Sequence, residues 1–573
     1  MLQKLFTTRG ESLTGTPWNV YPRPRMKRNS WISLNGEWDF GLEPKALDRK
    51  ILVPFCPESA LSGIHAHFPE GSWLFYRRYV TLPGGFLRGR LLLHIGAADQ
   101  TARVYVNGHL AGEHQGPGSF CADVTRVWQE GKNEITISCR DDLRDKSFPY
   151  GKQTMKRGGM WYTPVSGIWQ SVWLESVPET CIEKLNIENR GRCVTVSTVP
   201  ALEGRVTVKD LGEFELQNGS VTITPEDPHL WSPEDPYLYD FTVECGEDRV
   251  ESYFAIRLLE IKRIGEYPRL CLNGKPCFFH ALLDQGYWPD GILTPAAPEC
   301  YTDDILAMKK LGFNTLRKHI KVEAEEFYYQ CDRLGMIVFQ DMVNNSDYGY
   351  IRDTVLPTLF PAYQKRSDKR LHKNEVHRQR FLEAMEATVE QLKNHPCICC
   401  WTIFNEGWGQ FDADGVYEQF RKLDDTRFID TTSGWFRQKQ SDVDSRHVYF
   451  RKVNLTGDGE KPLLLSEFGG KTWRVEGHVF NPDKTYGYGG CKTREELNDA
   501  LVKLYMDEVL HCVKRGLCGA VYTQVSDVED EINGLMTYDR KVIKLDPERM
   551  QAVAAALQAA VSEKEVANYT KIR

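Results

Sequence analysis

Two glutamates, Glu406 and Glu467, each come at the end of a strongly apolar segment of the chain (398–405 and 462–466). If these segments are strands of a barrel, both carboxyl groups lie at the rim of the barrel interior. Glycoside hydrolysis needs such a pair, because an un-ionised carboxyl group protonates the leaving oxygen while a carboxylate attacks the anomeric carbon. The charge of Glu467 would help to keep Glu406 protonated. The alternative is that both are solvated loop residues, as most glutamates are.

Polar residues also stand at the ends of the other apolar segments. Barrel enzymes build their active sites at the carboxyl ends of the strands, so these residues are candidates for substrate contact. They are Asp284, Arg317, Lys318, His319, Lys321, Asp341, Asn405, His447, Tyr449 and Gln524.

The segments that would position these residues alternate between strand and helix patterns from residue 263 to 573. The predicted strands are 276–283, 313–319, 336–342, 398–406, 427–433, 446–450, 462–468 and 520–526. The predicted helices are 301–312, 323–335, 375–394, 414–424, 494–516 and 546–564. Eight strands in alternation with helices predict a (β/α)8 TIM barrel. The polar stretch 344–374 shows no strand pattern, and long loops of this kind often cover an active site.

Two β-rich regions precede the barrel. Residues 1–178 contain short β-branched and aromatic runs separated by turn signals, which predict a β-sandwich. Residues 179–262 alternate apolar and polar positions, and their size favours an immunoglobulin-like β-sandwich. The chain is therefore expected to be a multidomain protein with the catalytic residues in its last domain.

The composition argues against several other classes of protein. The 573 residues carry a formal net charge of −7, which is not the basic balance of a general nucleic-acid binder. No segment approaches the ~18 apolar residues of a membrane span, and the first residues lack the apolar core of a signal peptide. The sixteen cysteines are therefore expected to be reduced thiols in a cytoplasm. Cys397, Cys399 and Cys400 are close together but lack a second pair at zinc spacing, so we expect buried thiols.

Several motifs together resemble glycoside hydrolase family 2, and they cover nearly the whole chain. Those in the barrel are FNEGWGQ (404–410), similar to the acid/base motif, LLSEFGG (464–470), similar to the nucleophile segment, LNGKP (272–276) and GFNTLR (312–317). Those near the N-terminus are SLNGEWDF (33–40), VYVNG (104–108) and SGIWQSVWLE (166–175), which resemble the jelly-roll domain of the family. The resemblance implies a jelly-roll β-sandwich at residues 1–178 and an exo-acting retaining β-glycosidase.

The resemblance also implies roles for matching residues. Glu406 would be the general acid/base and Glu467 the nucleophile. Asn405 would bond the sugar 2-hydroxyl, a contact that strengthens in the transition state. Arg317 would orient the nucleophile and keep it ionised, and Asp284 would hold a distal hydroxyl of the terminal sugar.

Aromatic residues and one histidine have less certain assignments. Tyr449 would sit beside the nucleophile. Trp408 and Trp435 are candidates for stacking on a sugar or aglycone, with core packing as the alternative. His447 is either a site residue or a packed, hydrogen-bonded histidine.

The two-carboxylate mechanism requires no metal or redox cofactor. Large β-galactosidases of the family bind magnesium and sodium near the site, but no segment of this chain maps onto those ligands, and we expect none. The expected partner is a small glycoside or oligosaccharide, with no nucleic acid and no membrane. Members of the family are often homodimers or homotetramers.

The sugar is harder to predict. Family glucuronidases hold the substrate carboxylate with an N-x-K motif after the eighth strand, whereas here Asn533 is followed by Gly534 and Leu535. The cluster RKHIK (317–321) offers substitute positive charge through Lys318, His319 and Lys321, which favours a hexuronide, either galacturonide or glucuronide.

The alternative is that these lysines are solvated or pair with Glu323, Glu325 or Glu326. A neutral β-galactoside would then be the substrate. A non-catalytic carbohydrate-binding protein on the same fold is a further alternative, although both catalytic carboxylates are present. A metal-dependent hydrolase and a secreted lectin fit less well, since no paired-histidine motif and no secretion signal are visible.

Overall fold

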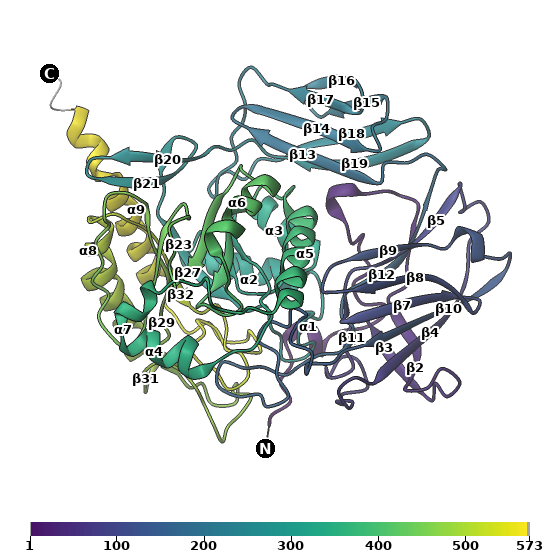
Figure 1. Cartoon of the computed structure of the whole chain (residues 1–573), viewed down its shortest axis with the longest axis horizontal. Coiled ribbons are helices and arrows are strands. Elements are labelled where there is room, and N and C mark those ends of the chain that lie inside the picture. The colour runs from purple at the N-terminus through teal and green to yellow at the C-terminus, as the bar shows by residue number, and fades with distance from the viewer. Residues whose placement is uncertain (1, 570–573) are drawn as a thin grey trace.

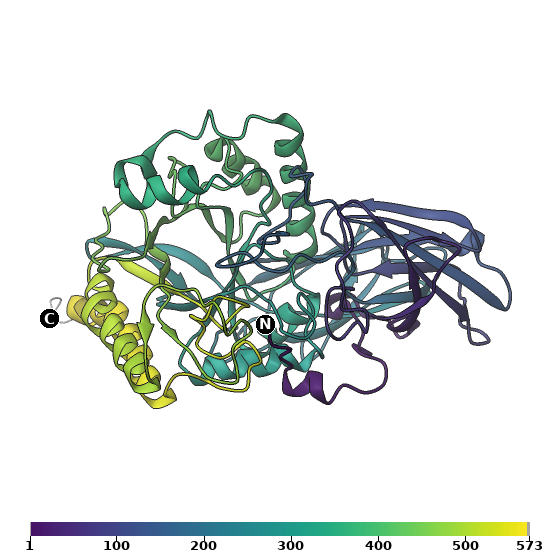
Figure 2. The ribbon, with the colours of Figure 1, turned by 90° about the horizontal axis from the view of Figure 1, so that it is seen from below.

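The computed structural model describes residues 2–569 and forms two β-sandwiches and a barrel (Figure 1). In this view the N-terminal sandwich lies at the right, the second sandwich at the top and the barrel at the left (Figure 1). Seen from below, the N-terminal sandwich projects to one side of the barrel (Figure 2). Residues 570–573 of the predicted barrel domain lie outside the described residues.

The N-terminal sandwich consists of two main antiparallel sheets that share one core. One sheet has the order β1-β12-β5-β9 and the other β3-β2-β4-β10-β7-β8. Inward residues alternate with outward ones along the strands, and Trp38, Phe40 and Tyr76 are fully buried between the sheets. The predicted β-sandwich is confirmed. Its strands are β1 (Trp31–Ser33), β2 (Gly36–Gly41), β3 (Arg49–Val53), β4 (Trp73–Thr81), β5 (Arg90–Ile95), β6 (Ala98–Asp99), β7 (Thr101–Val106), β8 (His109–Gln115), β9 (Phe120–Asp123), β10 (Lys132–Arg140), β11 (Gly167–Ile168) and β12 (Val172–Val177).

The second sandwich is smaller and has sheets of the order β13-β14-β17 and β16-β15-β18-β19. Its core is formed by valines and aromatic residues from both sheets, including Phe241 and Phe254. A three-stranded sheet leads from it into the barrel. The strands are β13 (Lys184–Arg190), β14 (Cys193–Val199), β15 (Gly204–Val208), β16 (Gly212–Leu216), β17 (Ser220–Ile223), β18 (Tyr239–Cys245), β19 (Asp248–Phe254), β20 (Leu259–Ile264), β21 (Tyr267–Leu272) and β22 (Lys275–Pro276).

The barrel is an eight-stranded parallel sheet of the order β27-β26-β25-β24-β23-β32-β29-β28. Its end strands β27 and β28 lie next to each other, and the Ser433 hydroxyl and His447 Nε2, 3.0 Å apart, link them. The predicted TIM barrel is confirmed. The strands are β23 (Phe279–Asp284), β24 (Thr315–Lys318), β25 (Ile337–Asp341), β26 (Ile398–Asn405), β27 (Phe428–Ser433), β28 (Asp444–Val448), β29 (Leu463–Gly469) and β32 (Leu517–Thr523), with the short pair β30 (Thr472–Trp473) and β31 (Gly490–Cys491) outside it.

Helices cover the outside of the barrel at the predicted positions. They are α2 (Glu299–Lys310), α3 (Glu325–Leu334), α5 (Glu375–Leu392), α6 (Ala413–Leu423), α7 (Arg494–Lys503), continued by the π-helical turn η5 (Leu504–Val509) and α8 (Leu510–Val513), and α9 (Pro547–Tyr569). Short helical turns precede the barrel at α1 (Thr8–Glu11), η1 (Pro24–Met26) and η2 (Thr125–Val127). No helix within residues 2–569 is long and apolar enough to cross a membrane.

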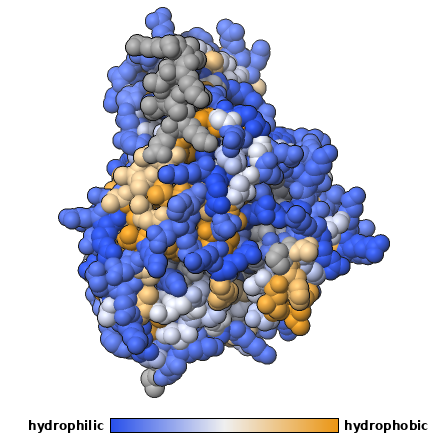
Figure 3. Space-filling model, turned by 90° about the vertical axis from the view of Figure 1, so that its left-hand side faces the viewer, coloured by the Kyte–Doolittle hydropathy of each residue, from blue (hydrophilic) through white to orange (hydrophobic). Residues whose placement is uncertain are grey.

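The stretch 344–374 contains short helical turns and no strand, as the sequence predicted. The turns are η3 (Tyr350–Val355), α4 (Leu356–Leu359) and η4 (Pro361–Lys365). Tyr350, Ile351, Leu359 and Phe360 are exposed apolar side chains of this stretch. The left-hand face of the molecule is mostly hydrophilic, with apolar residues gathered in a few patches (Figure 3).

Candidate active site

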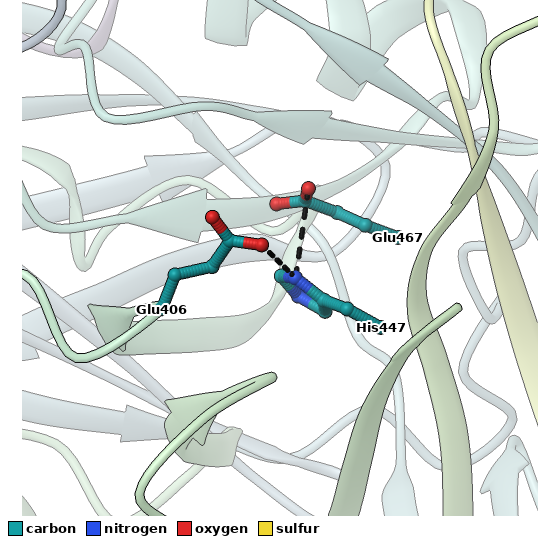
Figure 4. A group of neighbouring side chains, drawn as sticks. All are labelled: Glu406, His447 and Glu467. Atoms are coloured by element: carbon teal, nitrogen blue, oxygen red, sulfur yellow. Dashed lines mark hydrogen bonds and ion pairs between the residues drawn. The ribbon is translucent and has the colours of Figure 1, made fainter. Parts of the chain in front are cut away.

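Three side chains from three strand ends meet at the mouth of the barrel: Glu406 after β26, His447 in β28 and Glu467 in β29 (Figure 4). His447 Nδ1 lies 2.8 Å from Glu406 Oε1 and 3.6 Å from Glu467 Oε2. One ligand atom from each of the three lies within 4.8 Å of the others. The histidine therefore stands between the two carboxylates that the sequence singled out.

The backbone at Glu406 is unusual and helps to aim its carboxyl group. Glu406 has φ +51° and Gly407 φ +73°, so the chain turns through two left-handed residues where β26 ends. A Cβ atom at Gly407 would lie 2.2 Å from the Phe436 ring, which explains the glycine there. The Glu406 amide donates to the Ser433 carbonyl at 2.9 Å and fixes the turn to the neighbouring strand. Strained backbone of this kind is concentrated at functional sites.

Glu467 is buried and is surrounded by donors. Arg317 Nη1 donates to its Oε1 at 3.2 Å, and the Tyr449 hydroxyl donates to its Oε2 at 2.9 Å. Burial alone would raise the pKa of Glu467, but the positive charges of His447 and Arg317 outweigh it and lower the pKa to about 2. The Glu467 carboxylate is therefore ionised near neutral pH.

Arg317 connects the side chains of Asp341, Asn405 and Glu467 beneath the site. Its Nε and Nη2 donate to the two oxygens of Asp341 at 2.9 and 3.0 Å, and Nη2 also donates to Asn405 Oδ1 at 2.8 Å. Only 1% of Arg317 is exposed. Planar, bidentate contacts of this type hold a buried guanidinium rigidly, so Arg317 fixes both Asn405 and Glu467.

His319 lies in the same network. Its Nδ1 is 2.8 Å from Asp341 Oδ2. Burial lowers the pKa of His319 to about 4, and the positive charge of Lys152 adds to this effect. His319 is thus a neutral imidazole near neutral pH.

The two lysines of the RKHIK cluster are held by protein acceptors. Lys318 Nζ donates to Asp284 at 2.6 Å and to Glu323 at 3.0 Å. Lys321 Nζ donates to Glu323 at 2.7 Å and to the carbonyls of Gly286 and Leu293 at 2.5 and 2.7 Å. All three N–H bonds of Lys321 are occupied, and burial lowers its pKa to about 8. This is the pairing with Glu323 that the sequence left open, and it favours a structural role for both lysines.

The two tryptophan candidates, Trp408 and Trp435, have different surroundings. Trp408 is packed among Tyr150, Trp161 and Tyr348 at ring distances of 5.1–5.5 Å, which corresponds to the core-packing alternative. Trp435 lies 5.5 Å from the His447 ring, and its buried indole N–H has no hydrogen-bond partner among the described residues.

Gln524 is fully buried next to the stretch that lacks the N-x-K lysine. Its Nε2 donates to Asn533 Oδ1 at 2.9 Å, and Asn533 Nδ2 donates to Glu531 at 2.9 Å. The Tyr162 hydroxyl of the N-terminal sandwich donates to the other oxygen of Glu531 at 2.5 Å. The segment after β32 is therefore acidic at this point.

Sequence reasoning missed the residues that the N-terminal sandwich brings to the site. Residues 148–163, between β10 and β11, contact the barrel mouth through Tyr150, Trp161 and Tyr162. The only sequence signal was the Gly- and Lys-rich composition of GKQTMKRGGMWY (151–162), which does not reveal a contact with a domain so far along the chain.

The three side chains that meet at the barrel mouth have the chemistry of metal ligands. Within the described chain, one group of three His, Cys, Asp or Glu residues has metal-binding spacing, and it consists of Glu406, His447 and Glu467. The close approach of His447 Nδ1 to Glu406 requires a shared proton there, which a metal ion would displace.

Two family models match this chain. The model "Glycosyl hydrolases family 2, TIM barrel domain" matches residues 270–545, and "Glycosyl hydrolases family 2" matches residues 184–257. The chain belongs to glycoside hydrolase family 2. This confirms the resemblance that the motifs indicated.

Relatives within the family 2 glycoside hydrolases are distant. A β-galactosidase of Thermoanaerobacter pseudethanolicus is 24% identical over 398 residues, which are 63% of this chain and 49% of that protein. A β-glucuronidase of Felis catus is 25% identical over 399 residues, which are 60% of this chain and 56% of that protein. The aligned residues thus span about half the length of these curated relatives. A solved β-D-glucuronidase structure from Dictyoglomus thermophilum has a TM-score of 0.71 at 19% identity, covering 95% of this chain and 98% of that one, which shows the shared fold.

Proposed function

We propose that this protein is an exo-acting retaining β-glycosidase that removes a terminal β-linked sugar by double displacement. The observation that carries the proposal is the spacing of the carboxyl groups, since ligand atoms of Glu406 and Glu467 lie within 4.8 Å of each other. Retaining glycosidases have carboxyl groups about 5–5.5 Å apart, whereas inverting enzymes need about 6.5–9.5 Å to admit a water molecule.

In the first step the ionised Glu467 attacks the anomeric carbon while Glu406 donates its proton to the departing glycosidic oxygen. In the second step Glu406 takes a proton from water, the water oxygen attacks the anomeric carbon, and the bond to Glu467 breaks. His447 holds the Glu406 carboxyl group in place. Arg317 and Tyr449 keep Glu467 ionised and oriented, and Asn405 bonds the sugar 2-hydroxyl.

We propose a β-hexuronide, galacturonide or glucuronide, as the preferred substrate, with a neutral β-galactoside as the alternative. The two relatives described above, a β-galactosidase and a β-glucuronidase, represent both possibilities. We reassign Lys318 and Lys321 to structural ion pairs, because their donors already have acceptors within the protein. Asp284, which accepts from Lys318 and from the Gly286 amide, remains the proposed partner of a distal hydroxyl of the sugar.

The stereochemical outcome tests the proposal directly. Hydrolysis of a nitrophenyl β-glycoside in the presence of methanol should give the methyl β-glycoside, read by proton NMR of the anomeric hydrogen. Formation of the α-anomer would exclude double displacement.

Variants test the two roles separately. Glu467→Gln should lose about 10⁴-fold or more in kcat, because no covalent intermediate can form. Glu406→Gln should lose much less on a nitrophenyl glycoside than on an alkyl glycoside, because nitrophenolate leaves without protonation. The exposed Glu386→Gln on α5 is the matched control and should keep the parent rate. An equal loss on both substrates would contradict the acid role of Glu406.

We further propose a homo-oligomer, dimer or tetramer, and a cytoplasmic location. The exposed apolar side chains of the stretch 344–374 support the first, because such clusters often mark contacts between subunits. The sixteen cysteines, all free thiols, support the second. Light scattering of the purified protein and fractionation of the source cells test them.

A further inference from the structure

Residues 148–163 of the N-terminal sandwich form a loop that is fixed onto the mouth of the barrel. The Tyr150 amide donates to the Asn344 carbonyl at 3.1 Å, and its hydroxyl donates to the Ser346 carbonyl at 2.7 Å. The Thr163 amide donates to Glu529 at 2.8 Å. This loop, called the sandwich loop below, is therefore part of the site rather than of the sandwich surface.

Lys152 stands in the middle of the sandwich loop, and the residues on both sides of it are fixed. Gly151 has φ +60°, and a Cβ atom there would lie 3.1 Å from the carbonyl oxygen of Ile320, directly after His319. Gln153 accepts from the Val165 amide at 2.8 Å, and the Lys152 carbonyl accepts from the Tyr162 amide at 3.0 Å. The backbone of Lys152 is thus held against the end of β24.

Lys152 is half-buried, and among residues 2–569 no hydrogen bond or ion pair engages its ammonium group. Its charge reaches two groups of the site, since it lowers the pKa of both Glu467 and His319. Two arginines of this region are already paired. Arg317 is held by Asp341, and Arg157 of the sandwich loop is held by Asp530 at 2.9 Å.

The first part of the segment after β32 carries acidic residues and no cation of its own. Residues 529–535 after β32 contain Glu529, Asp530 and Glu531 and no lysine or arginine. A substrate carboxylate that enters the pocket would therefore meet negative charge from the barrel segment and positive charge from the sandwich loop.

We propose that Lys152 is the specificity-determining residue that binds the carboxylate of a terminal β-hexuronide. The assignment rests on the glycosidase function proposed above and gives it a substrate class. An ammonium group that has no hydrogen-bond partner among residues 2–569, stands on a loop fixed to the end of β24 and can rotate its three donors matches a sugar carboxylate, with which it forms a charge-assisted hydrogen bond. A neutral hexose offers only a hydroxymethyl group at the same position.

The test compares four nitrophenyl β-glycosides (galacturonide, glucuronide, galactoside and glucoside) with the full-length protein and three variants. Lys152→Met should lower the ratio of uronide to galactoside kcat/KM by about 10- to 100-fold, the loss expected for one charge-assisted hydrogen bond. Lys152→Arg, which keeps the charge, should recover most of this ratio. Lys156→Met removes an exposed lysine from the same loop and should leave the ratio unchanged.

A binding measurement complements the kinetics. Galacturonate or glucuronate should inhibit the parent protein at lower concentration than galactose, and Lys152→Met should remove this difference. An unchanged melting temperature shows that a variant is folded.

The outcomes separate this inference from the proposed function. If Lys152→Met slows uronide and galactoside equally, Lys152 only supports Glu467 and the inference is wrong. If the parent protein hydrolyses the galactoside but neither uronide, the inference is also wrong while the glycosidase function stands. If none of the four glycosides is hydrolysed by the parent protein, the proposed function itself fails.

Discussion

Replacing His447 with glutamine should move the acidic limit of activity. In the structure His447 approaches Glu406 at 2.8 Å and Glu467 at 3.6 Å, and it is buried. Glutamine can still hydrogen-bond to either carboxyl group but carries no charge. The variant therefore removes one positive charge from the centre of the site and little volume.

The size of the effect follows from the pKa of Glu467. Burial raises this pKa, but nearby positive charges lower it from the ordinary 4.5 to about 2, and His447 makes the largest of these lowering contributions. The net difference corresponds to about 3 kcal/mol. Two opposite charges about 4 Å apart attract by about 4 kcal/mol at an effective dielectric constant of 20. Loss of His447 should therefore raise the pKa of Glu467 by about one to three pH units, less where water replaces the imidazole.

The assay is the pH dependence of kcat/KM for a nitrophenyl β-glycoside between pH 3 and 8. Because Glu467 of the parent protein stays ionised down to about pH 2, its protonation should not limit kcat/KM above pH 4. In His447→Gln an acidic limb should appear near pH 4–5. The exposed His511→Gln on α8 is the control and should match the parent profile.

The pH dependence of the free energy of unfolding should also change in His447→Gln. A carboxyl group with a lowered pKa in the folded state stabilises it above the ordinary value of 4.5, and this contribution is lost as the pH falls toward 2. His447→Gln should therefore flatten this part of the stability profile. If both the kinetic and the stability profiles of the variant overlay those of the parent, His447 does not control the charge of Glu467 and the electrostatic reasoning is refuted.

Three further predictions concern other parts of the molecule. Trp231 is fully buried between the second sandwich and the barrel, and its indole donates to the Asp332 carbonyl at 2.7 Å, so Trp231→Ala should cost about 3–5 kcal/mol in urea unfolding; a loss below 1 kcal/mol would contradict this. Burial raises the pKa of Glu58 to about 7, so the free energy of unfolding of the parent protein should fall by up to about 3 kcal/mol as the pH rises from 4.5 to 7. Glu58→Gln should abolish this pH dependence, and an unchanged pH dependence would show that other groups produce it. EDTA should leave the hydrolysis rate unchanged, whereas millimolar Zn²⁺ should inhibit in competition with substrate by displacing the proton at His447; loss of activity with EDTA would show a required metal ion.

Much of the fold could be predicted from the sequence, because hydrophobic periodicity is a local property. The helix predicted at 323–335 is α3 at Glu325–Leu334, and the strand predicted at 398–406 is β26 at Ile398–Asn405. Glu406 and Glu467 were found for the same reason, since the end of an apolar strand is visible in the sequence and barrel topology brings all such ends to one face.

The ion pairs could not be predicted in this way. The sequence offered Glu323, Glu325 and Glu326 as partners for the lysines of the RKHIK cluster, and only the structure selects Glu323, which lies before α3 and faces both Lys318 and Lys321. The choice depends on distances of a few tenths of an ångström, which the closure of the barrel sets and which no local pattern encodes.

The sequence by itself thus determined the order of the domains, the barrel and the two glutamates proposed as catalytic, since each follows from the alternation of apolar and polar residues along a short segment. Only the tertiary structure placed His447 between these glutamates and brought the loop that carries Lys152, from another domain, onto the end of β24. The physical reason is that charge interactions act through space. Their strength depends on the separation and burial of groups that lie far apart in the chain, whereas secondary structure depends on neighbours within a few residues.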